Sequence, residues 1–266
     1  MIRAPAILLL VAVALPGAET RAERGRRILN ETLRALGGER FLAMRDRTES
    51  GRAYSFYREQ LAGLSRATLY TRYLTRPEPP VPGKILLRER QAFGKDQDYS
   101  VLFDEEDGWQ ISFRGARPVP VELKERYRET TLRNIFYILR QRLGEPGMIV
   151  EFQSAEVFEN QPVEIVDISD SDNRTVTVFI HVSTRLPVRQ VFQRRDLKTR
   201  DRHEEVTRFS RYRDIGGGVL WPFTILRERD GEKIFEMFAE SITINQNLSD
   251  ELFTLRANWK VLPPAR

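Results

Sequence analysis

Two histidines and several clustered carboxylates are the residues of this chain that could carry acid–base or metal chemistry. His181 alternates with apolar residues in the segment VTVFIHVSTRLPVR, and His203 lies in the charged link RDLKTRDRHEE. A catalytic base needs a polar partner held beside it, and no motif such as HExxH, a P-loop or G-x-S-x-G supplies one. We therefore predict that the chain is not an enzyme. A hydrolase stays the alternative if the fold places one of the histidines beside a carboxylate in a pocket.

The acidic clusters do not have the spacing of a metal site. Residues 104–107 (DEED) precede Gly108, and we interpret them as a hairpin turn rather than a calcium site, because the EF-hand spacing is absent. Asp170 opens a stretch that begins like a calcium loop, but Arg174 stands at the next ligand position. Residues 216–218 (GGG) lack the G-x-G-x-x-G spacing of a dinucleotide site. We expect no metal and no cofactor.

Composition excludes further classes of protein. The chain has no cysteine, which rules out disulfides, thiol catalysis, cysteine-based zinc sites and lipid attachment at a lipobox cysteine. Its 43 basic and 38 acidic residues give a net charge of +5, which is spread along the chain instead of gathered in one patch. We expect no nucleic acid partner, and a slight preference for anionic lipid surfaces.

The first residues resemble a secretory signal peptide. Arg3 precedes an apolar run at residues 4–15, which is too short to span a membrane, and Pro16 and Gly17 follow it. Small residues suited to cleavage end the segment, so we predict a cleaved signal at residues 1–22, with cleavage after Ala22 or, as second choice, after Ala18. An uncleaved anchor is the alternative. The cleaved protein would be exported and soluble in the periplasm.

Periodicity indicates two helices and a large antiparallel sheet. Apolar residues recur at helical spacing in residues 24–36 and again in residues 121–143, where a continuous helix would be roughly 35 Å long. Period-two alternation predicts strands near residues 48–58, 64–74, 84–93, 99–104 and 108–114, then near residues 149–158, 162–169, 175–183, 187–194 and 204–212. We expect one domain at residues 23–256 and a loosely held tail at residues 257–266.

The strongest local pattern is a hairpin near the end of the chain. Apolar runs at residues 219–226 and 234–244 flank a charged link that contains Asp230 and Gly231, a strong turn signal because glycine accepts positive φ. In the first run Trp221, Phe223 and Ile225 fall on one face. With few helices to cover it, this apolar face predicts an α+β fold: a curved antiparallel sheet, an incomplete half-barrel, with helices on its concave side.

Several motifs resemble the LolA/LolB-like family of outer-membrane lipoprotein-sorting proteins. They are the helix ending at Ala35-Leu36-Gly37-Gly38, the strand–turn–strand VTVFIHVSTRLPVR, the pair YRD and VLWP, and the closing segment NQNLSDELF. The resemblance implies an incomplete antiparallel barrel closed by helices, whose cavity receives lipid acyl chains. The mature chain is longer than a typical LolA, and no functional arginine of the family can be aligned to one of the many arginines here.

From the apolar face and the resemblance together we expect a periplasmic carrier or binding protein for lipoprotein acyl chains or another lipid-like ligand. Apolar burial would drive binding, at about 0.8 kcal/mol per CH₂. The residues predicted to line the cavity are Trp221, Phe223, Ile225, Phe235, Met237, Phe136 and Leu139. Membrane contact would be transient, and the protein partners would be sorting proteins of the inner or outer membrane. The alternative is an envelope sensor or scaffold domain that binds a protein partner, in which these residues are ordinary core.

Overall fold

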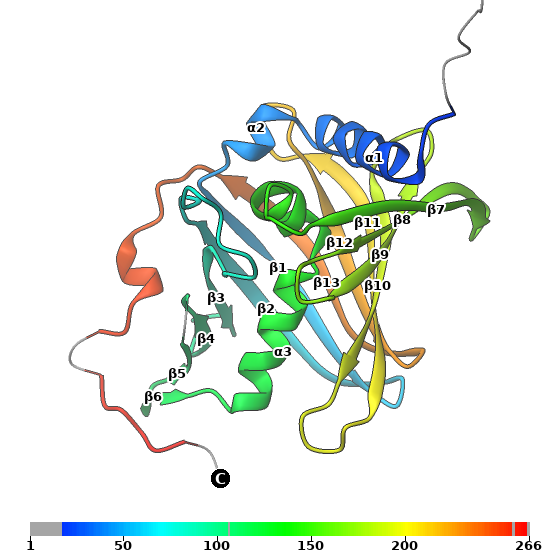
Figure 1. Cartoon of the computed structure of the whole chain (residues 1–266). Helices are drawn as coiled ribbons and strands as arrows, with labels where there is room; N and C mark the ends of the chain where they lie inside the picture. The colour runs from blue at the N-terminus through cyan, green and yellow to red at the C-terminus, as the bar shows by residue number, and fades with distance from the viewer. Residues whose placement is uncertain (1–17, 106, 257–258, 265–266) are drawn as a thin grey trace, which may run out of the picture.

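The computed structural model describes residues 18–105, 107–256 and 259–264. Within them, the chain forms one curved, unclosed antiparallel sheet with a few helices on its concave side (Figure 1). The prediction of a curved half-barrel with covering helices is confirmed. Residues 1–17 of the predicted signal peptide lie outside the described residues, so that segment stays a prediction.

The sheet consists of two meanders joined at its middle. The first contains β1 (Asp46–Tyr57), β2 (Gln60–Tyr73), β3 (Leu87–Phe93), β4 (Tyr99–Phe103), β5 (Gly108–Ser112) and β6 (Gly115–Pro118). The second contains β7 (Ile149–Phe158), β8 (Gln161–Ser169), β9 (Thr175–His181), β10 (Pro187–Arg195), β11 (Arg202–Asp214), β12 (Leu220–Arg229) and β13 (Glu232–Ile244). Because β1 pairs with β13, the spatial order runs from β6 back to β1 and then from β13 back to β7.

Strand β6 is absent from the sequence prediction, which ended the first meander at residue 114. It is four residues long and contains a proline, so its alternation is too short to detect. The predicted C-terminal tail is partly attached to this strand. Ala116 donates to the carbonyl of Lys260 at 2.9 Å and accepts from the amide of Leu262 at 2.7 Å.

Helix α1 (Arg21–Ala35) lies across one end of the sheet, followed by the short α2 (Glu39–Leu42) (Figure 1). Thr20 caps α1 and forms a capping box with Glu23. Ile28 and Leu29 are fully buried, and Gly25 lies so close to β7 that a Cβ there would be 2.9 Å from the amide nitrogen of Phe152. This helix is therefore packed directly on the sheet.

The second predicted helix is not continuous. The segment that crosses the concave face forms α3 (Val121–Leu132), the short α4 (Ile135–Tyr137) and the π-helical turn η1 (Ile138–Arg142). The break has a local cause: Asn134 is extended, and its side chain accepts from the amides of Phe136 and Tyr137 at 3.0 and 3.2 Å. At 12 residues, α3 is about 18 Å long, half the length expected.

The core fills only part of the space between sheet and helices. The main cluster joins α1, α2, α4 and η1 to strands β7–β13, and smaller clusters lie under the remaining strands. The last element is a 3₁₀ turn, η2 (Asp250–Phe253), whose Phe253 is buried. Within the described residues, no helix is both long and apolar enough to cross a membrane.

Candidate functional site

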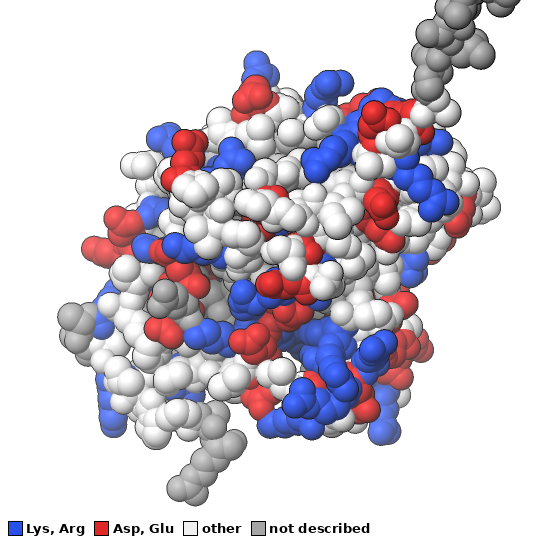
Figure 2. Space-filling model, viewed as in Figure 1, with Lys and Arg blue, Asp and Glu red and all other residues white. Residues whose placement is uncertain are grey.

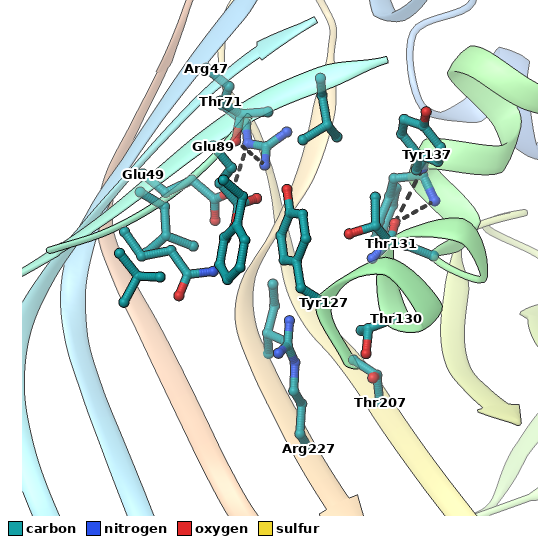
Figure 3. Close-up of a pocket in the computed structure, with 18 of the residues that line it drawn as sticks. Arg47, Glu49, Thr71, Glu89, Tyr127, Thr130, Thr131, Tyr137, Thr207 and Arg227 are labelled. Carbon is teal, nitrogen blue, oxygen red and sulfur yellow. Dashed lines mark hydrogen bonds and ion pairs between the residues drawn. The ribbon is translucent and has the colours of Figure 1, made fainter. Parts of the chain in front are cut away.

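A cavity of about 310 Å³ lies between the concave face of the sheet and α3 (Figure 3). Strands β1–β4 form one wall, β11 and β12 form another, and α3 with the start of α4 covers it. This volume is at the lower end of the range of roughly 300–1,000 Å³ that holds small-molecule ligands.

One side of the cavity is aromatic. The rings of Phe136 and Trp221 lie 4.6 Å apart, and Phe136 meets Phe209 edge to face at 5.0 Å. These three residues are buried and belong to the main core. The cavity thus begins where the core ends, beneath the break between α3 and α4.

A buried ion pair stands on the sheet wall. The Arg47 Nε donates to Glu49 Oε1 at 2.6 Å, and the guanidinium lies 4.0 Å from the centre of the Trp221 ring. Both side chains are at most 8% exposed. Burial disfavours the charged guanidinium, but Tyr73 and Glu49 outweigh burial and hold the pKa of Arg47 above its usual range. The Arg47 guanidinium therefore stays charged, and Glu49 is its direct partner.

A second carboxylate, Glu89 on β3, has no comparable ion pair within the described chain. It accepts a hydrogen bond of 2.6 Å from Gln91. Burial raises the pKa of Glu89, while Gln91 and the positive charges of Arg47 and Arg227 oppose this shift. Tyr127 of α3 faces the same space, and burial raises the pKa of its phenol, so it is a neutral hydroxyl at physiological pH (Figure 3).

Helix α3 is attached to the sheet by few contacts. The Tyr127 ring stacks on Phe103 with centroids 3.7 Å apart and an interplanar angle of 3°. In the first turn of α3, Glu122 forms an exposed ion pair of 2.8 Å with Lys198, which lies on the link between β10 and β11. Only Leu132 of the helix is fully buried. These contacts are those of a cover that could open at low cost.

The end of the crossing segment is anchored by a buried charge network. Arg142, 2% exposed, donates to Glu145 at 2.7 Å, to Asp170 at 2.9 Å and to the carbonyl of Leu132. Burial tends to raise the pKa of Asp170, but hydrogen bonds from Arg142 and Arg174 prevail and lower it. The network joins η1 to the β8–β9 turn and supports α3 at its last residue.

The structure brings together some of the residues predicted to line the cavity. Phe136, Trp221 and Ile225 line it. Phe223 and Leu139 lie in the main core, and Phe235 and Met237 lie in a smaller cluster with Ala53 and Ala67. None of these placements tests ligand contact, so the binding role stays a prediction for all seven residues.

Sequence reasoning missed the polar lining, which includes Arg47, Glu49, Glu89, Tyr127 and Arg227. The sequence did contain one indication of this polar lining. Arg227 continues the period-two series of Trp221, Phe223 and Ile225, but it was assigned to the charged link between the hairpin strands. Charged residues at inward positions of a strand are the feature that marks this cavity.

The two histidines lie outside the cavity. The His203 Nδ1 lies 2.6 Å from Asp230 at the exposed end of the β12–β13 hairpin. His181 accepts at Nδ1 from the amides of Ser183 and Thr184, both at 3.2 Å, in the turn after β9. Each histidine therefore has a local structural role. In the described ranges, no group of three or more histidine or acidic residues could hold a metal ion.

No protein-family model and no curated protein sequence matches this chain. Solved structures do match. A domain named for outer membrane lipoprotein sorting, from Vibrio parahaemolyticus, is 13% identical, with a TM-score of 0.57 over 88% of this chain and 97% of the domain. A DUF1329 family protein from Desulfovibrio piger is 13% identical, with a TM-score of 0.57 over 86% of this chain and 97% of that protein.

A LolA superfamily protein from Nitrosomonas europaea is 11% identical, with a TM-score of 0.55 over 86% of this chain and 97% of that protein. Identities this low show a shared fold and nothing finer. The LolA-like fold predicted from the sequence motifs is confirmed.

Proposed function

We propose that this protein is a periplasmic carrier or binding protein that holds an acyl chain, of a lipoprotein or another lipid-like molecule, in the cavity beneath α3 without covalent chemistry. The observation that carries the proposal is the cavity itself. The LolA-like sheet and its covering helix enclose free space where a purely structural interface would be filled by side chains.

The lining supports an alkyl ligand. Apolar side chains from every wall reach the cavity, including Leu69, Leu87, Val101, Leu123, Phe136 and Ile225. Transfer of an alkyl chain from water to such a site is favourable by about 0.8 kcal/mol per CH₂. Entry would require α3 to move. This movement would break the stack of Tyr127 on Phe103, the ion pairs of Glu122 and Glu129, and the hydrogen bond from Arg128 to the Gly83 carbonyl.

Narrowing the cavity tests the proposal. Thr130 of α3 and Thr207 of β11 both line the cavity, so Thr130→Phe and Thr207→Phe should each fill part of it (Figure 3). Thr243→Phe is the control, because Thr243 is exposed on β13. We expect uptake of a fluorescent fatty acid to fall at least tenfold in the first two variants, as for loss of about 1.4 kcal/mol of binding, and to be unchanged in the third.

Native mass spectrometry of protein purified without detergent provides an independent readout. A co-purified lipid or acylated peptide at near-stoichiometric amount would support the carrier role and identify the ligand class. Protein that is repeatedly empty and takes up no fatty acid would contradict it, and would favour the alternative of a domain that binds a protein partner.

A further inference from the structure

Two arginines that line the cavity differ from Arg47 in how their charge is compensated. Arg126 of α3 and Arg227 of β12 line the cavity from opposite sides. Neither forms a salt bridge within the described part of the chain, whereas Arg47 pairs with Glu49. In Figure 3 the Arg227 side chain points from β12 toward Tyr127, into the space beneath α3.

The charges around this pair are of both signs. Glu205 attracts Arg126, and Glu89, Glu205 and Glu49 attract Arg227. Arg194 and Arg229 lie close enough to Arg126 to repel it, and both bind the same carboxylate, Glu205, at 3.0 Å. Burial and then the charge of Arg229 lower the pKa of Arg126 to about 10, so it stays protonated at neutral pH. Figure 2 shows Lys and Arg side chains gathered beside α3, toward the ends of β10 and β11.

Arg227 also has unused hydrogen-bonding capacity. Its Nε is buried and has no hydrogen-bond partner in the described ranges, and the same holds for the Tyr127 hydroxyl. The guanidinium lies 5.6 Å from the Phe235 ring centre, a contact that leaves its N–H edges available to an acceptor. Buried donors without acceptors are costly, and an oxyanion would satisfy several of them together.

We propose that Arg126 and Arg227 bind the anionic group of an amphiphilic ligand, a phosphate or a carboxylate, while its alkyl chain occupies the apolar part of the cavity. This assignment rests on the proposed carrier function and specifies the ligand class. Arginine forms two parallel hydrogen bonds to such groups, so a site with one arginine on the sheet and one on α3 would also hold the helix closed over the ligand.

Glu89 adjusts the strength of this site. Its carboxylate lies within electrostatic range of Arg227 without an ion pair to it, and it also faces Gln91, Arg47 and Glu49. An ionised Glu89 weakens the attraction of Arg227 for an anion. Glu89→Gln should therefore increase affinity for the anionic ligand at neutral pH, a change opposite in sign to loss of an arginine.

Matched ligands with one alkyl chain length test the proposal. Binding of dodecyl phosphate, laurate, uncharged monolaurin and inorganic phosphate to the purified full chain is measured by calorimetry. We expect both anionic amphiphiles to bind about tenfold to a hundredfold more tightly than monolaurin, as for one or two charge-assisted hydrogen bonds. A preference for phosphate over carboxylate would identify a phospholipid-like source, and the reverse a fatty acid.

The variants Arg126→Gln, Arg227→Gln and Arg227→Lys separate charge from geometry. Each glutamine variant should reduce the preference for the anionic amphiphiles at least fivefold and leave monolaurin binding unchanged, while Arg227→Lys retains part of the preference. The control is Arg52→Gln, because Arg52 is exposed and pairs with Glu240. Arg126 lies on the lightly packed α3, so its variant keeps the test valid if Arg227→Gln does not fold.

The outcomes distinguish this proposal from the carrier function. Equal binding of charged and uncharged amphiphiles would overturn the anionic site and leave the carrier function standing. Binding of none of the amphiphiles would overturn the carrier function. Inorganic phosphate that binds as tightly as dodecyl phosphate would show a small-anion site independent of the alkyl chain and would overturn the proposal as stated.

Discussion

The two halves of the segment that crosses the concave face differ in every contact they make. In α4 and η1 every residue is buried, and Arg142 ties the end to Glu145 and Asp170. In α3 a single residue is fully buried, and most of its charged side chains face solvent or the cavity. Thus α4 and η1 close the core, whereas α3 covers the cavity.

This difference shows how one connection can serve two purposes. The anchored half fixes the position of the last turn of α3, because Arg142 binds the carbonyl of Leu132. Asn134, between the halves, ends one helix and caps the next. A cover hinged at Asn134 could open without disturbing the core. The contrast leads to four predictions about stability.

Arg142→Met should produce the largest loss of stability among these variants. It leaves Glu145 and Asp170 buried without their main partner, so we expect the free energy of unfolding to fall by about 3–5 kcal/mol. Urea denaturation followed by circular dichroism measures it. Lys124→Met, on α3, should be close to neutral, because the Lys124 side chain is 44% exposed and its ion pair with Asp107 is at the surface. Equal losses in the two variants would remove the distinction between an anchored and a covering half.

Two tyrosines give a matched comparison. The Tyr137 hydroxyl accepts from the Leu86 amide at 2.7 Å and donates to the Lys84 carbonyl at 3.1 Å, whereas the Tyr127 hydroxyl forms no comparable hydrogen bond in the described chain. Tyr137→Phe should lower the free energy of unfolding by about 1–3 kcal/mol, because the Leu86 amide is left unsatisfied. Tyr127→Phe should be neutral or slightly stabilising. A larger loss for Tyr127→Phe in the same denaturation experiment would reverse the assignment of the halves.

Asn134→Ala should have a smaller effect on the free energy of unfolding. It removes the side-chain acceptor for the amides of Phe136 and Tyr137, which costs about 1 kcal/mol in typical helix caps. Asn134→Ser keeps an acceptor and should restore most of the loss. Faster hydrogen exchange confined to residues 135–138 in the alanine variant would support the hinge, and exchange that is faster throughout α3 and α4 alike would argue against it.

Acid should weaken the anchored half. The pKa of Asp170 is below its usual range, so the folded state binds its proton less readily than the unfolded chain. Its contribution is therefore present at neutral pH and is lost as the pH falls below about 4, toward the folded-state pKa. The gap in melting temperature between the wild type and Asp170→Asn should narrow over this interval. A gap that stays constant with pH would show that the carboxylate charge is not what stabilises the turn.

Sequence periodicity predicted most of the sheet because its strands alternate strongly and its turns carry clear signals. Asp230 and Gly231, both with positive φ, form the turn between β12 and β13 as expected. The break at Asn134 was not predictable from periodicity, since the apolar stripe continues through it and the cause is a capping side chain. Neither was the polar cavity, because the contact of Arg47 on β1 with the Trp221 ring on β12 arises only when the sheet curves.

The N-terminal end of α1 bears on where the predicted signal peptide would be cleaved. Thr20 and Glu23 form the capping box of this helix. Cleavage after Ala22 would remove Thr20, whereas cleavage after Ala18 would retain the whole motif. The capping box therefore fits cleavage after Ala18, the second choice from the sequence, better than the first choice, Ala22. N-terminal sequencing of the mature protein decides between them.

The pairing of β1 with β13 has a consequence for how the chain folds. Arg47 lies opposite Ile244, so the central seam of the sheet joins strands from opposite ends of the sequence, while every other pairing is between neighbours. Closing so long a loop is entropically slow, and both meanders expose an unpaired edge until it happens. We therefore expect the two meanders to form before β1 pairs with β13, the step that completes the curved sheet.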